Sequence, residues 1–323
     1  MKLSINGNEA KILMISKRGS IIQNTSTIES DEDFYVVFCY TSPNCSLNEY
    51  PTDIQKEAKL YKDLQAQLSN QGLELNGDVV FKEIRALLAS KTSSGTYDYF
   101  FTPKEFVINA SCEWEWVDAL KSLMYNHNEI LNHLWRKVGS LYESLSNHPT
   151  NVSRFMYYAR IYEQTFITGK YTPWLENEEY ASDIRNVKLG GSPMFSLSDY
   201  KYKVEKLHLT VPLVKSDEVL EIKNLKSEIL GVIQQHCIGN LEQMSIKLPI
   251  KSSMIYSCSY DFTYEYLDIR FSTHPQNYYS FRGLRLKDLK LAVEAKSFGR
   301  HFKANIENKF TVYKNGELLT ERG

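Results

Sequence analysis

Residues 260–270 read Tyr-Asp-Phe-Thr-Tyr-Glu-Tyr-Leu-Asp-Ile-Arg, and residues 289–298 read Leu-Lys-Leu-Ala-Val-Glu-Ala-Lys-Ser-Phe. In both runs apolar or aromatic residues alternate with polar ones. This is typical of β-strands, whose successive side chains point to opposite faces of a sheet. The two runs therefore predict two strands near the C-terminus, and on the second of them Glu294 and Lys296 would share a face.

Further strand signals lie at both ends of the chain. Residues 3–5 and 11–15 flank a turn at Asn6-Gly7-Asn8 and predict a hairpin. Residues 34–40 are continuously apolar, which predicts a strand buried on both faces. Beyond residue 190 the pattern predicts a helix over residues 217–236 and strands over residues 203–214, 244–248, 253–258, 260–271, 287–298 and 310–313.

The middle of the chain carries helical periodicity. After Pro51, Thr52 and Gln55 fit a capping box and predict a helix that ends near Gly72. Residues 79–89 predict a shorter helix, and residues 106–108 a strand or loop.

The clearest periodic signal is a heptad seam over residues 117–145, which Pro149 ends. His127 occupies a seam position, where a structural role is favoured over metal binding. An aromatic stripe over residues 155–166 predicts a second helix that folds back as an antiparallel hairpin, with a coiled-coil dimer as the alternative.

These elements predict an α+β protein. Because the N-terminal strands are too few for a stable domain, we expect them to join the C-terminal strands. The expected scaffold is mostly antiparallel and is formed by the N- and C-terminal segments, with a helical insertion that contains the helical hairpin. The expected domains are residues 1–48 with 190–323, and residues 49–189, with a boundary at Gly190-Gly191-Ser192-Pro193.

Composition and charge narrow the class of protein. Of the 323 residues, 42% are hydrophobic and 24% charged, which is ordinary for a globular protein. The net charge of −1 gives no overall attraction to nucleic acid or membrane. From Arg282 onward, however, ten Lys and Arg face five Asp and Glu, a net charge of +5 against −6 in the remainder. This segment either meets a phosphate backbone or is neutralised within its own fold.

Cysteine usage and hydropathy predict a cytoplasmic location. The five cysteines are scattered, odd in number and contain no Cys-x-x-Cys, which favours reduced thiols. The N-terminal residues lack the apolar core of a signal peptide. No apolar run approaches the roughly 18 residues that span a bilayer, so no membrane partner is expected. Phosphate-loop, dinucleotide-binding, zinc-protease and nucleophile-elbow motifs are absent from the sequence.

Cations and aromatic rings interleave between residues 278 and 303. Phosphates attract the cations and bases stack on exposed rings, which predicts a binding protein, part of a larger assembly, that contacts nucleic acid through this surface. The candidate nucleic-acid-binding residues are Arg282, Arg285, Lys287, Lys290, Arg300, His301 and Lys303. A strand surface balanced by the acidic remainder of the chain is the alternative.

Glu294 and Lys296 suggest an enzymatic alternative. The pattern apolar-apolar-Glu-x-Lys resembles the second half-motif of the PD-(D/E)xK nuclease superfamily over about thirty residues. The resemblance implies an upstream aspartate, for which Asp268 is the best-placed candidate. It implies that Asp268 and Glu294 would hold Mg²⁺ through oxygen ligands and that Lys296 would balance developing charge. A third hypothesis is a structural or protein-interaction role for the helical hairpin, by self-association or with another protein.

Overall fold

The computed structural model describes residues 1–41, 58–89, 94–146, 148–240 and 244–319. It contains 47% helix and 20% strand, with sheets in the N- and C-terminal segments and helices between them, which confirms the α+β class. The chain divides into two compact units. The first unit comprises Met1–Ala110 and Asn126–Lys215, and the second unit Ser111–Tyr125 and Ser216–Gly323. These bounds differ from the division expected at residues 49 and 190.

The first unit is built on a five-stranded sheet. Its strands are β1 (Lys2–Ile5), β2 (Asn8–Arg18), β3 (Asp33–Tyr40) and β4 (Val79–Glu83) in that order, with β5 (Val107–Ala110) also paired to β2. Only the β3–β4 pair is parallel among these described strands. The predicted N-terminal hairpin is confirmed, because Asn6 and Gly7 both have positive φ and Ile5 pairs with Asn8.

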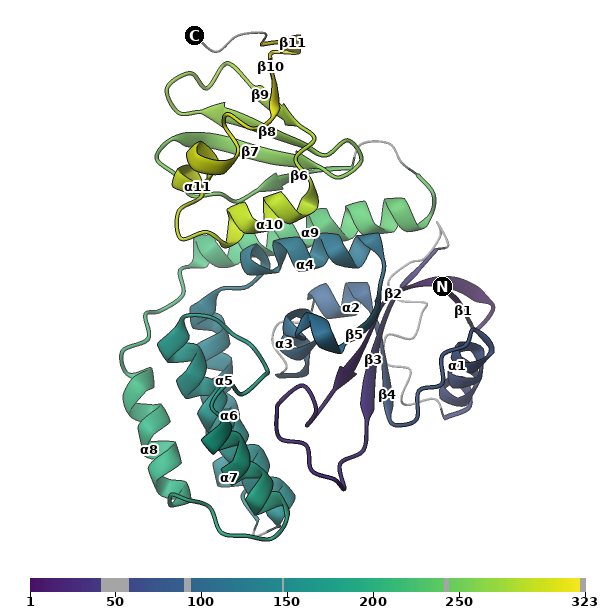
Figure 1. The fold of residues 1–323 in the computed structure, drawn as a ribbon, viewed down its shortest axis with the longest axis vertical. Coiled ribbons are helices and arrows are strands. Elements are labelled where there is room, and N and C mark those ends of the chain that lie inside the picture. The colour runs from purple at the N-terminus through teal and green to yellow at the C-terminus, as the bar shows by residue number, and fades with distance from the viewer. Residues whose placement is uncertain (42–57, 90–93, 147, 241–243, 320–323) are drawn as a thin grey trace. The chain divides into compact units, whose positions relative to one another are not determined.

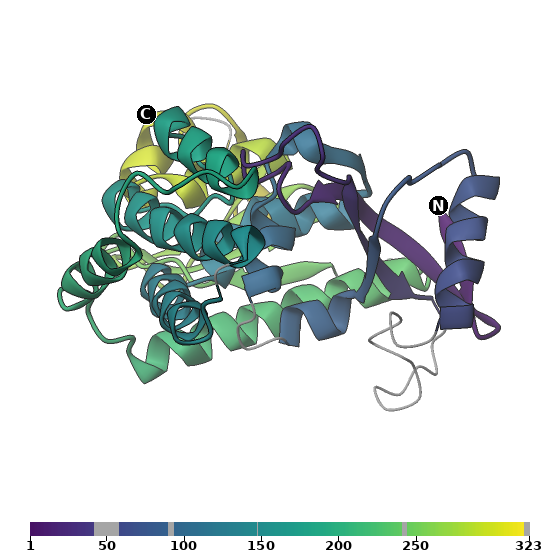
Figure 2. The same cartoon turned by 90° about the horizontal axis from the view of Figure 1, so that it is seen from below.

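Strand β3 is buried on both faces, as its continuous apolar run predicts. On one face Phe38 belongs to a cluster with Leu64 and Leu68 of α1 (Ala58–Asn70), which lies beside the N-terminal strands (Figure 2). On the other face Tyr35 stacks on Tyr99 of α3 (Ser94–Phe101), with ring centroids 3.7 Å apart. Apolar side chains from both sides therefore enclose the strand.

The predictions for the segments around this sheet have different outcomes. The predicted helix over residues 79–89 is only half right, because Val79, Phe81 and Glu83 alternate inward as strand β4 before α2 (Ile84–Ala89) begins. Of the two alternatives expected at residues 106–108, a strand or a loop, the structure has a strand, β5. The capping box at Thr52 and Gln55 lies outside the described residues, whereas α1 ends shortly before Gly72 as expected.

Besides α1, α2 and α3, the first unit contains the helices α5 (His127–Glu143), α6 (Pro149–Thr168), α7 (Glu178–Lys188) and α8 (Leu197–His208). Helices α5 and α6 pack together, and Tyr142 near the end of α5 contacts Phe155 near the start of α6, which confirms the antiparallel hairpin (Figure 1). The continuous seam over residues 117–145 is wrong. It is interrupted at Asn126, whose side chain accepts hydrogen bonds from the N–H groups of Asn128 and Glu129 and starts a new helix.

The strand predicted over residues 203–214 is also wrong, because α8 covers residues 203–208 and no strand forms over the rest. Ser196 caps this helix by accepting a hydrogen bond from the N–H of Asp199. Tyr200 and Val204, four residues apart, are the buried side chains of the helix. The apolar residues of this segment therefore follow helical rather than strand spacing.

The second unit contains its own antiparallel sheet. Its strands follow chain order: β6 (Ser245–Leu248), β7 (Ile255–Asp261), β8 (Tyr266–Phe271), β9 (Tyr279–Arg282), β10 (Thr311–Lys314) and β11 (Glu317–Leu318) (Figure 1). The N-terminal strands pair with none of these, so the expectation of one joint sheet is wrong. Strands β6, β7 and β10 confirm those predicted near residues 244–248, 253–258 and 310–313.

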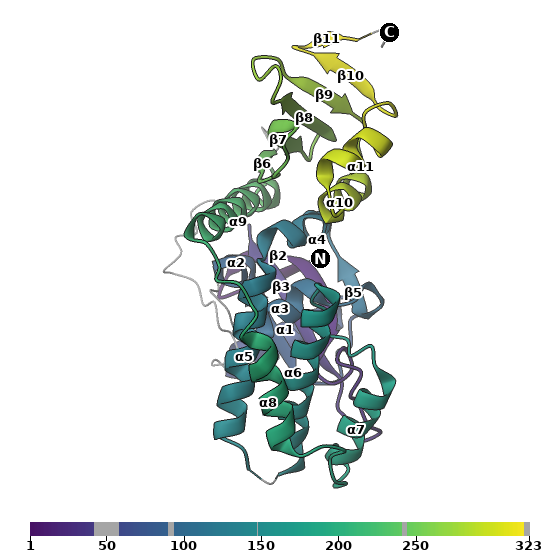
Figure 3. The ribbon, with the colours of Figure 1, turned by 90° about the vertical axis from the view of Figure 1, so that its left-hand side faces the viewer.

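One face of this second sheet is buried. A row of directly paired residues crosses five strands on that face: Ile246, Tyr260, Leu267, Phe281 and Val312. The helices of the unit are α4 (Cys112–Met124), α9 (Ser216–Cys237), α10 (Leu286–Glu294) and α11 (Phe298–Asn305). Phe302 of α11 meets Phe281 edge to face at 5.0 Å, and α10 and α11 lie together on one side of the sheet (Figure 3). Helix α9 confirms the helix predicted over residues 217–236.

Residues 260–270, predicted as one strand, form a hairpin instead. The carboxylate of Asp261 accepts hydrogen bonds from the N–H groups of Thr263 and Tyr264, and Glu265 has a positive φ of 54°. Asp side chains favour turns through such local hydrogen bonds. The chain therefore reverses between β7 and β8.

Residues 289–298, predicted as a second strand, form most of α10 and the start of α11. Leu289 and Ala292 are fully buried, whereas Leu291 is 58% exposed. A strand would bury Leu289 and Leu291 together, so the burial follows helical spacing.

Among the described helices, none is long and apolar enough to cross a membrane.

Candidate functional site

The face of the second sheet opposite its buried row carries aromatic and charged side chains. Tyr266 pairs directly with Arg282, and the guanidinium carbon of Arg282 lies 4.7 Å from the centroid of the Tyr266 ring. The same carbon lies 3.5 Å from the centroid of the Tyr313 ring. The Tyr264 ring stacks on the Tyr266 ring with centroids 5.6 Å apart. We call these four side chains the aromatic row, and this side of the sheet the open face.

The period of the strands explains how the row forms. On β9, Phe281 points into the core and its neighbour Arg282 points to the open face. On β8, Leu267 is buried and Tyr266 is on the open face. The register of β8, β9 and β10 then aligns side chains that are far apart in the sequence.

The aromatic row is partly accessible to solvent. Tyr264 is 63% exposed and ends the row, while the other three side chains are half-buried by their contacts with one another. A cation over a ring at such a site contributes about 0.5–1 kcal/mol. These contacts hold Arg282 in place without removing the row from solvent.

The remaining charges on the open face are nearly balanced. Lys247 and Arg270 are exposed, and within the described part of the chain no ion pair joins either of them. Asp268 accepts a hydrogen bond from the hydroxyl of Ser280, and Asp261 accepts the two turn hydrogen bonds described above. The acidic groups are therefore engaged within the fold, while the cations extend into solvent.

The structure separates Arg282 from the other candidate nucleic-acid-binding residues. Arg285 precedes α10 and lies 3.7 Å from the carboxylate of Asp288. The Nζ of Lys290 lies 2.5 Å from Oδ2 of Asp118 in α4. Lys287 is on α10, and Arg300, His301 and Lys303 are on α11. These helices cover the buried face, so among the candidates only Arg282 belongs to the open face.

Asp268, Glu294 and Lys296 are not brought together. Asp268 is on the open face, with Ser280 as its hydrogen-bond partner. Glu294 is the last residue of α10, and Lys296 lies between α10 and α11; both are exposed. No hydrogen bond or ion pair found in the described ranges links the three. The strand that would place Glu294 and Lys296 on one face is replaced by a helix end.

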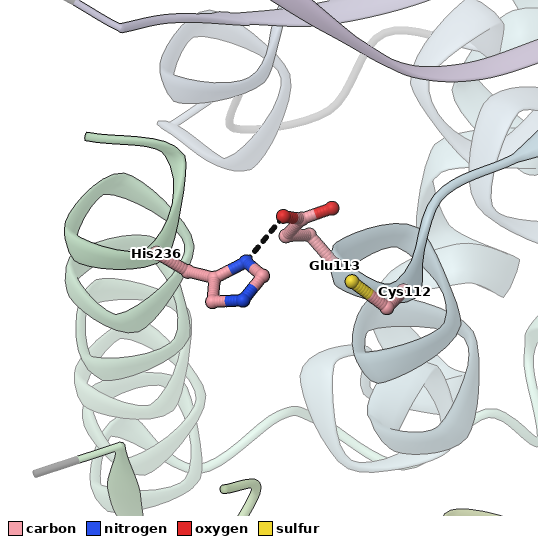
Figure 4. Close-up of side chains that lie close together, drawn as sticks. All are labelled: Cys112, Glu113 and His236. Carbon is pink, nitrogen blue, oxygen red and sulfur yellow. Dashed lines mark hydrogen bonds and ion pairs between the residues drawn. The ribbon is translucent and has the colours of Figure 1, made fainter. Parts of the chain in front are cut away.

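A second cluster in this unit combines a thiol, a carboxylate and an imidazole. Cys112 and Glu113 are the first residues of α4, and His236 is near the end of α9 (Figure 4). Their potential ligand atoms all lie within 4.8 Å of one another, and no other such group of three occurs among the residues described. Glu113 is fully buried, and its Oε1 is hydrogen-bonded to Nδ1 of His236.

Helix α4 fixes the position of this cluster. The Ser111 side chain accepts a hydrogen bond from the N–H of Trp114 and starts the helix, which places Cys112 and Glu113 in its first turn. The Trp116 ring contacts the His236 ring edge to face at 5.0 Å. The sequence offers no spacing motif for this cluster, because His236 is on a different helix far along the chain.

The first unit encloses a carboxylate of its own. Asp98 of α3 is 7% exposed and accepts a hydrogen bond of 2.7 Å from the hydroxyl of Tyr171. Burial raises the pKa of Asp98 to about 7, although the Tyr171 hydrogen bond and the charge of Arg18 oppose the increase. Because it is buried and hydrogen-bonded, we interpret Asp98 as a structural residue.

Comparison with known proteins gives no indication of what the aromatic row or the cluster of Cys112, Glu113 and His236 does. No known protein family matches the chain, and neither the curated proteins nor the solved structures contain a significant match. A functional conclusion therefore has to come from the geometry and chemistry of the sites themselves.

Proposed function

We propose that the second unit binds single-stranded nucleic acid on its open face, with the aromatic row as the stacking surface. The observation that carries this proposal is the row itself, in which Arg282 lies between the rings of Tyr266 and Tyr313 and Tyr264 extends the stack. Bases stack on such rings regardless of sequence, at about 1–3 kcal/mol per base. Single strands are favoured because a duplex keeps its base faces stacked internally.

Charge has a secondary role in this proposal. Three cations on the open face, Lys247, Arg270 and Arg282, are partly offset by two carboxylates. If all three cations neutralise phosphates, the logarithm of affinity falls with the logarithm of salt concentration with a slope of about −2. A steeper slope would require the cations of α10 and α11 to take part as well.

The proposal keeps the expected role of a binding protein within a larger assembly, with the second unit as the part that contacts nucleic acid. The helical hairpin of α5 and α6 is available for a separate protein contact, and such a role stays a prediction. No observation favours a magnesium-dependent nuclease, since Asp268 and Glu294 lie on different elements without a shared contact.

Fluorescence anisotropy of labelled oligonucleotides with the full chain tests the proposal. Single-stranded and duplex probes of about 12 nucleotides, the size of one binding site, are titrated across a salt series. Tyr264→Ala should weaken single-strand binding by about 5- to 100-fold, the equivalent of one lost stacking contact. Tyr202→Ala is the matched control, because Tyr202 is 66% exposed on α8 of the first unit.

A second comparison tests the choice of surface. Arg282→Ala should weaken binding and reduce the magnitude of the salt slope by about 0.7. The double substitution Arg300→Ala and Lys303→Ala removes two exposed charges of α11 and should leave affinity unchanged. The proposal is wrong if the wild type does not bind either probe, or if the α11 double variant loses binding while Tyr264→Ala retains it.

A further inference from the structure

We propose that Cys112, Glu113 and His236 form a binding site for a divalent transition-metal ion, with Zn²⁺ as the best match. Three ligand atoms of three chemical types converge from two helices to within 4.8 Å of one another (Figure 4). This inference concerns a different side-chain cluster from the aromatic row and does not depend on nucleic-acid binding.

The ligand types select the metal. A thiolate and an imidazole suit zinc and neighbouring transition metals, whereas Mg²⁺ and Ca²⁺ take oxygen ligands. In a tetrahedral zinc site with bonds of about 2.0–2.3 Å, the ligand atoms lie about 3.3–3.7 Å apart. The three atoms lie within 4.8 Å of one another, so side-chain rotations, most readily at the exposed Cys112, would bring them to this spacing, and the metal would replace the hydrogen bond between Glu113 and His236.

The surroundings hold two of the ligands in place. Glu113 is fully buried, so its ionised form carries a large desolvation cost unless a positive group lies beside it. In the structure its neighbour is His236, through the hydrogen bond between Nδ1 and Oε1, and Trp116 packs against the His236 ring. A divalent cation placed between these groups would bind both directly and compensate the buried carboxylate more fully than a histidine does.

Binding would change the protonation of the cluster. The Cys112 thiol must lose its proton to ligate the metal, and His236 must be neutral at the nitrogen that binds. Protons are therefore released on binding, and affinity rises with pH. Three protein ligands leave a fourth tetrahedral position for a water molecule or a small ligand, which is the arrangement of open zinc sites.

Titration of the reduced full chain with Co²⁺ tests the site, because a thiolate ligand gives cobalt a charge-transfer band in the near ultraviolet. We expect the wild type to show this band, to lose it when Zn²⁺ displaces cobalt, and to change its tryptophan fluorescence through Trp116. Cys112→Ser should abolish the band and weaken binding at least about tenfold, the lower bound for losing even an indirect ligand contact. Cys237→Ser is the matched control, since this thiol follows His236 directly but is not part of the cluster.

Several outcomes would overturn the site. A wild type that gives no charge-transfer band excludes a cobalt–thiolate centre. A band that survives Cys112→Ser, or that is lost only in Cys237→Ser, assigns the thiolate to another residue. Cys112 is exposed, so its substitution leaves the fold intact, whereas circular dichroism is needed to check Glu113→Gln, which changes a buried group. Nucleic-acid binding measured with a chelator present is expected to be unchanged, which separates this test from that of the open face.

Discussion

Strand β3 of the first sheet and strand β8 of the second sheet differ in which of their side chains are buried. In β3 of the first unit, every residue from Phe34 to Tyr40 is buried. In β8 of the second unit, buried Leu267 and Ile269 alternate with Asp268 and Arg270 on the open face. A strand covered on both sides keeps its side chains from solvent, whereas a strand with one uncovered face can present side chains to a ligand.

The polar groups of the first unit illustrate the cost of full enclosure. Glu83 and Arg85 form a buried ion pair with Nε and Oε1 3.0 Å apart. Such a pair gains little net stability, because desolvation offsets the attraction between the charges. Asp98 avoids part of this cost by keeping its proton to a higher pH. On the open face, by contrast, Arg270 and Lys247 remain hydrated and exposed.

The largest expected effect concerns the two-sided burial of β3. Phe38→Ala should lower the free energy of unfolding by about 3–5 kcal/mol, because it leaves a cavity beside α1. Val37→Ala, on the opposite face of the same strand, should cost about 2 kcal/mol for the methyl groups lost. Urea unfolding followed by circular dichroism measures both. A negligible effect of Val37→Ala would show that one face of β3 is less tightly packed than its burial indicates.

A pH series tests the enclosure of Asp98. Its pKa is about 7 in the folded protein and near 4 when unfolded, so between these values the folded state binds more protons and stability falls as pH rises. The stabilising contribution is complete below about pH 4 and is lost above about pH 7, a change of about 4 kcal/mol. Asp98→Asn removes this titration and can still accept the Tyr171 hydrogen bond.

The variant should therefore gain stability over the wild type as pH rises from 4 to 8, measured by urea unfolding at each pH. Asp199→Asn is the control, because Asp199 is an exposed carboxylate of the same unit. Parallel stability profiles for the wild type and Asp98→Asn would mean that Asp98 is hydrated in solution.

A smaller effect should distinguish the two faces of the second sheet. Val312 is 5% exposed in the buried row, whereas its neighbour Thr311 points to the open face. Val312→Ala should lower the free energy of unfolding by about 2 kcal/mol, and Thr311→Ala should change it by no more than about 0.5 kcal/mol. Thermal and urea unfolding of the pair measures the difference. Equal destabilisation would contradict an uncovered face at this end of the sheet.

Parts of this fold could be predicted from local chemistry. The turn at Asn6 and Gly7 has residues suited to positive φ, and the apolar run of β3 has a single compatible environment. The strand predictions over residues 203–214 and 289–298 failed because short apolar runs fit both strand and helical spacing. Ser196, the N-cap of α8, is a local signal for the first of these helices, whereas α10 begins after Arg285 without a side-chain cap.

The candidate sites were less accessible to prediction. Arg282 could be selected from the sequence as a cation among aromatic residues. Its position between Tyr266 and Tyr313, however, depends on the register of three strands, which no local pattern determines. Cys112 and Glu113 meet His236 only because α4 and α9 pack together, and nothing in their spacing suggests a metal site. Tertiary packing, rather than sequence neighbourhood, creates both sites.

The smallest expected effect concerns Lys290, a predicted nucleic-acid-binding residue that pairs with Asp118 instead. Burial raises the pKa of Asp118, but the ammonium groups of Lys121 and Lys290 outweigh it and hold the pKa below its usual value. A lowered carboxyl pKa stabilises the fold above the unfolded pKa, and this contribution is lost as pH falls through the folded pKa. Lys290→Ala should therefore cost less than about 1 kcal/mol at neutral pH, because both side chains are about one-third exposed. The difference in the free energy of unfolding between Lys290→Ala and the wild type should shrink as pH falls through the folded pKa of Asp118.

The same variant tests the contrast between the two sides of the second sheet. Lys290 is on α10, which covers the buried face, so Lys290→Ala should bind single-stranded probes as the wild type does, whereas Arg282→Ala should not. Lys287→Ala is the matched control, because Lys287 is an exposed lysine on the same helix. If Lys290→Ala weakened binding as much as Arg282→Ala, the nucleic acid would have to contact α10, and the open face could not be the whole binding surface. If only Arg282→Ala weakened binding, Lys290 of α10 would serve the fold, as the ion-pair partner of Asp118, and would not contact nucleic acid.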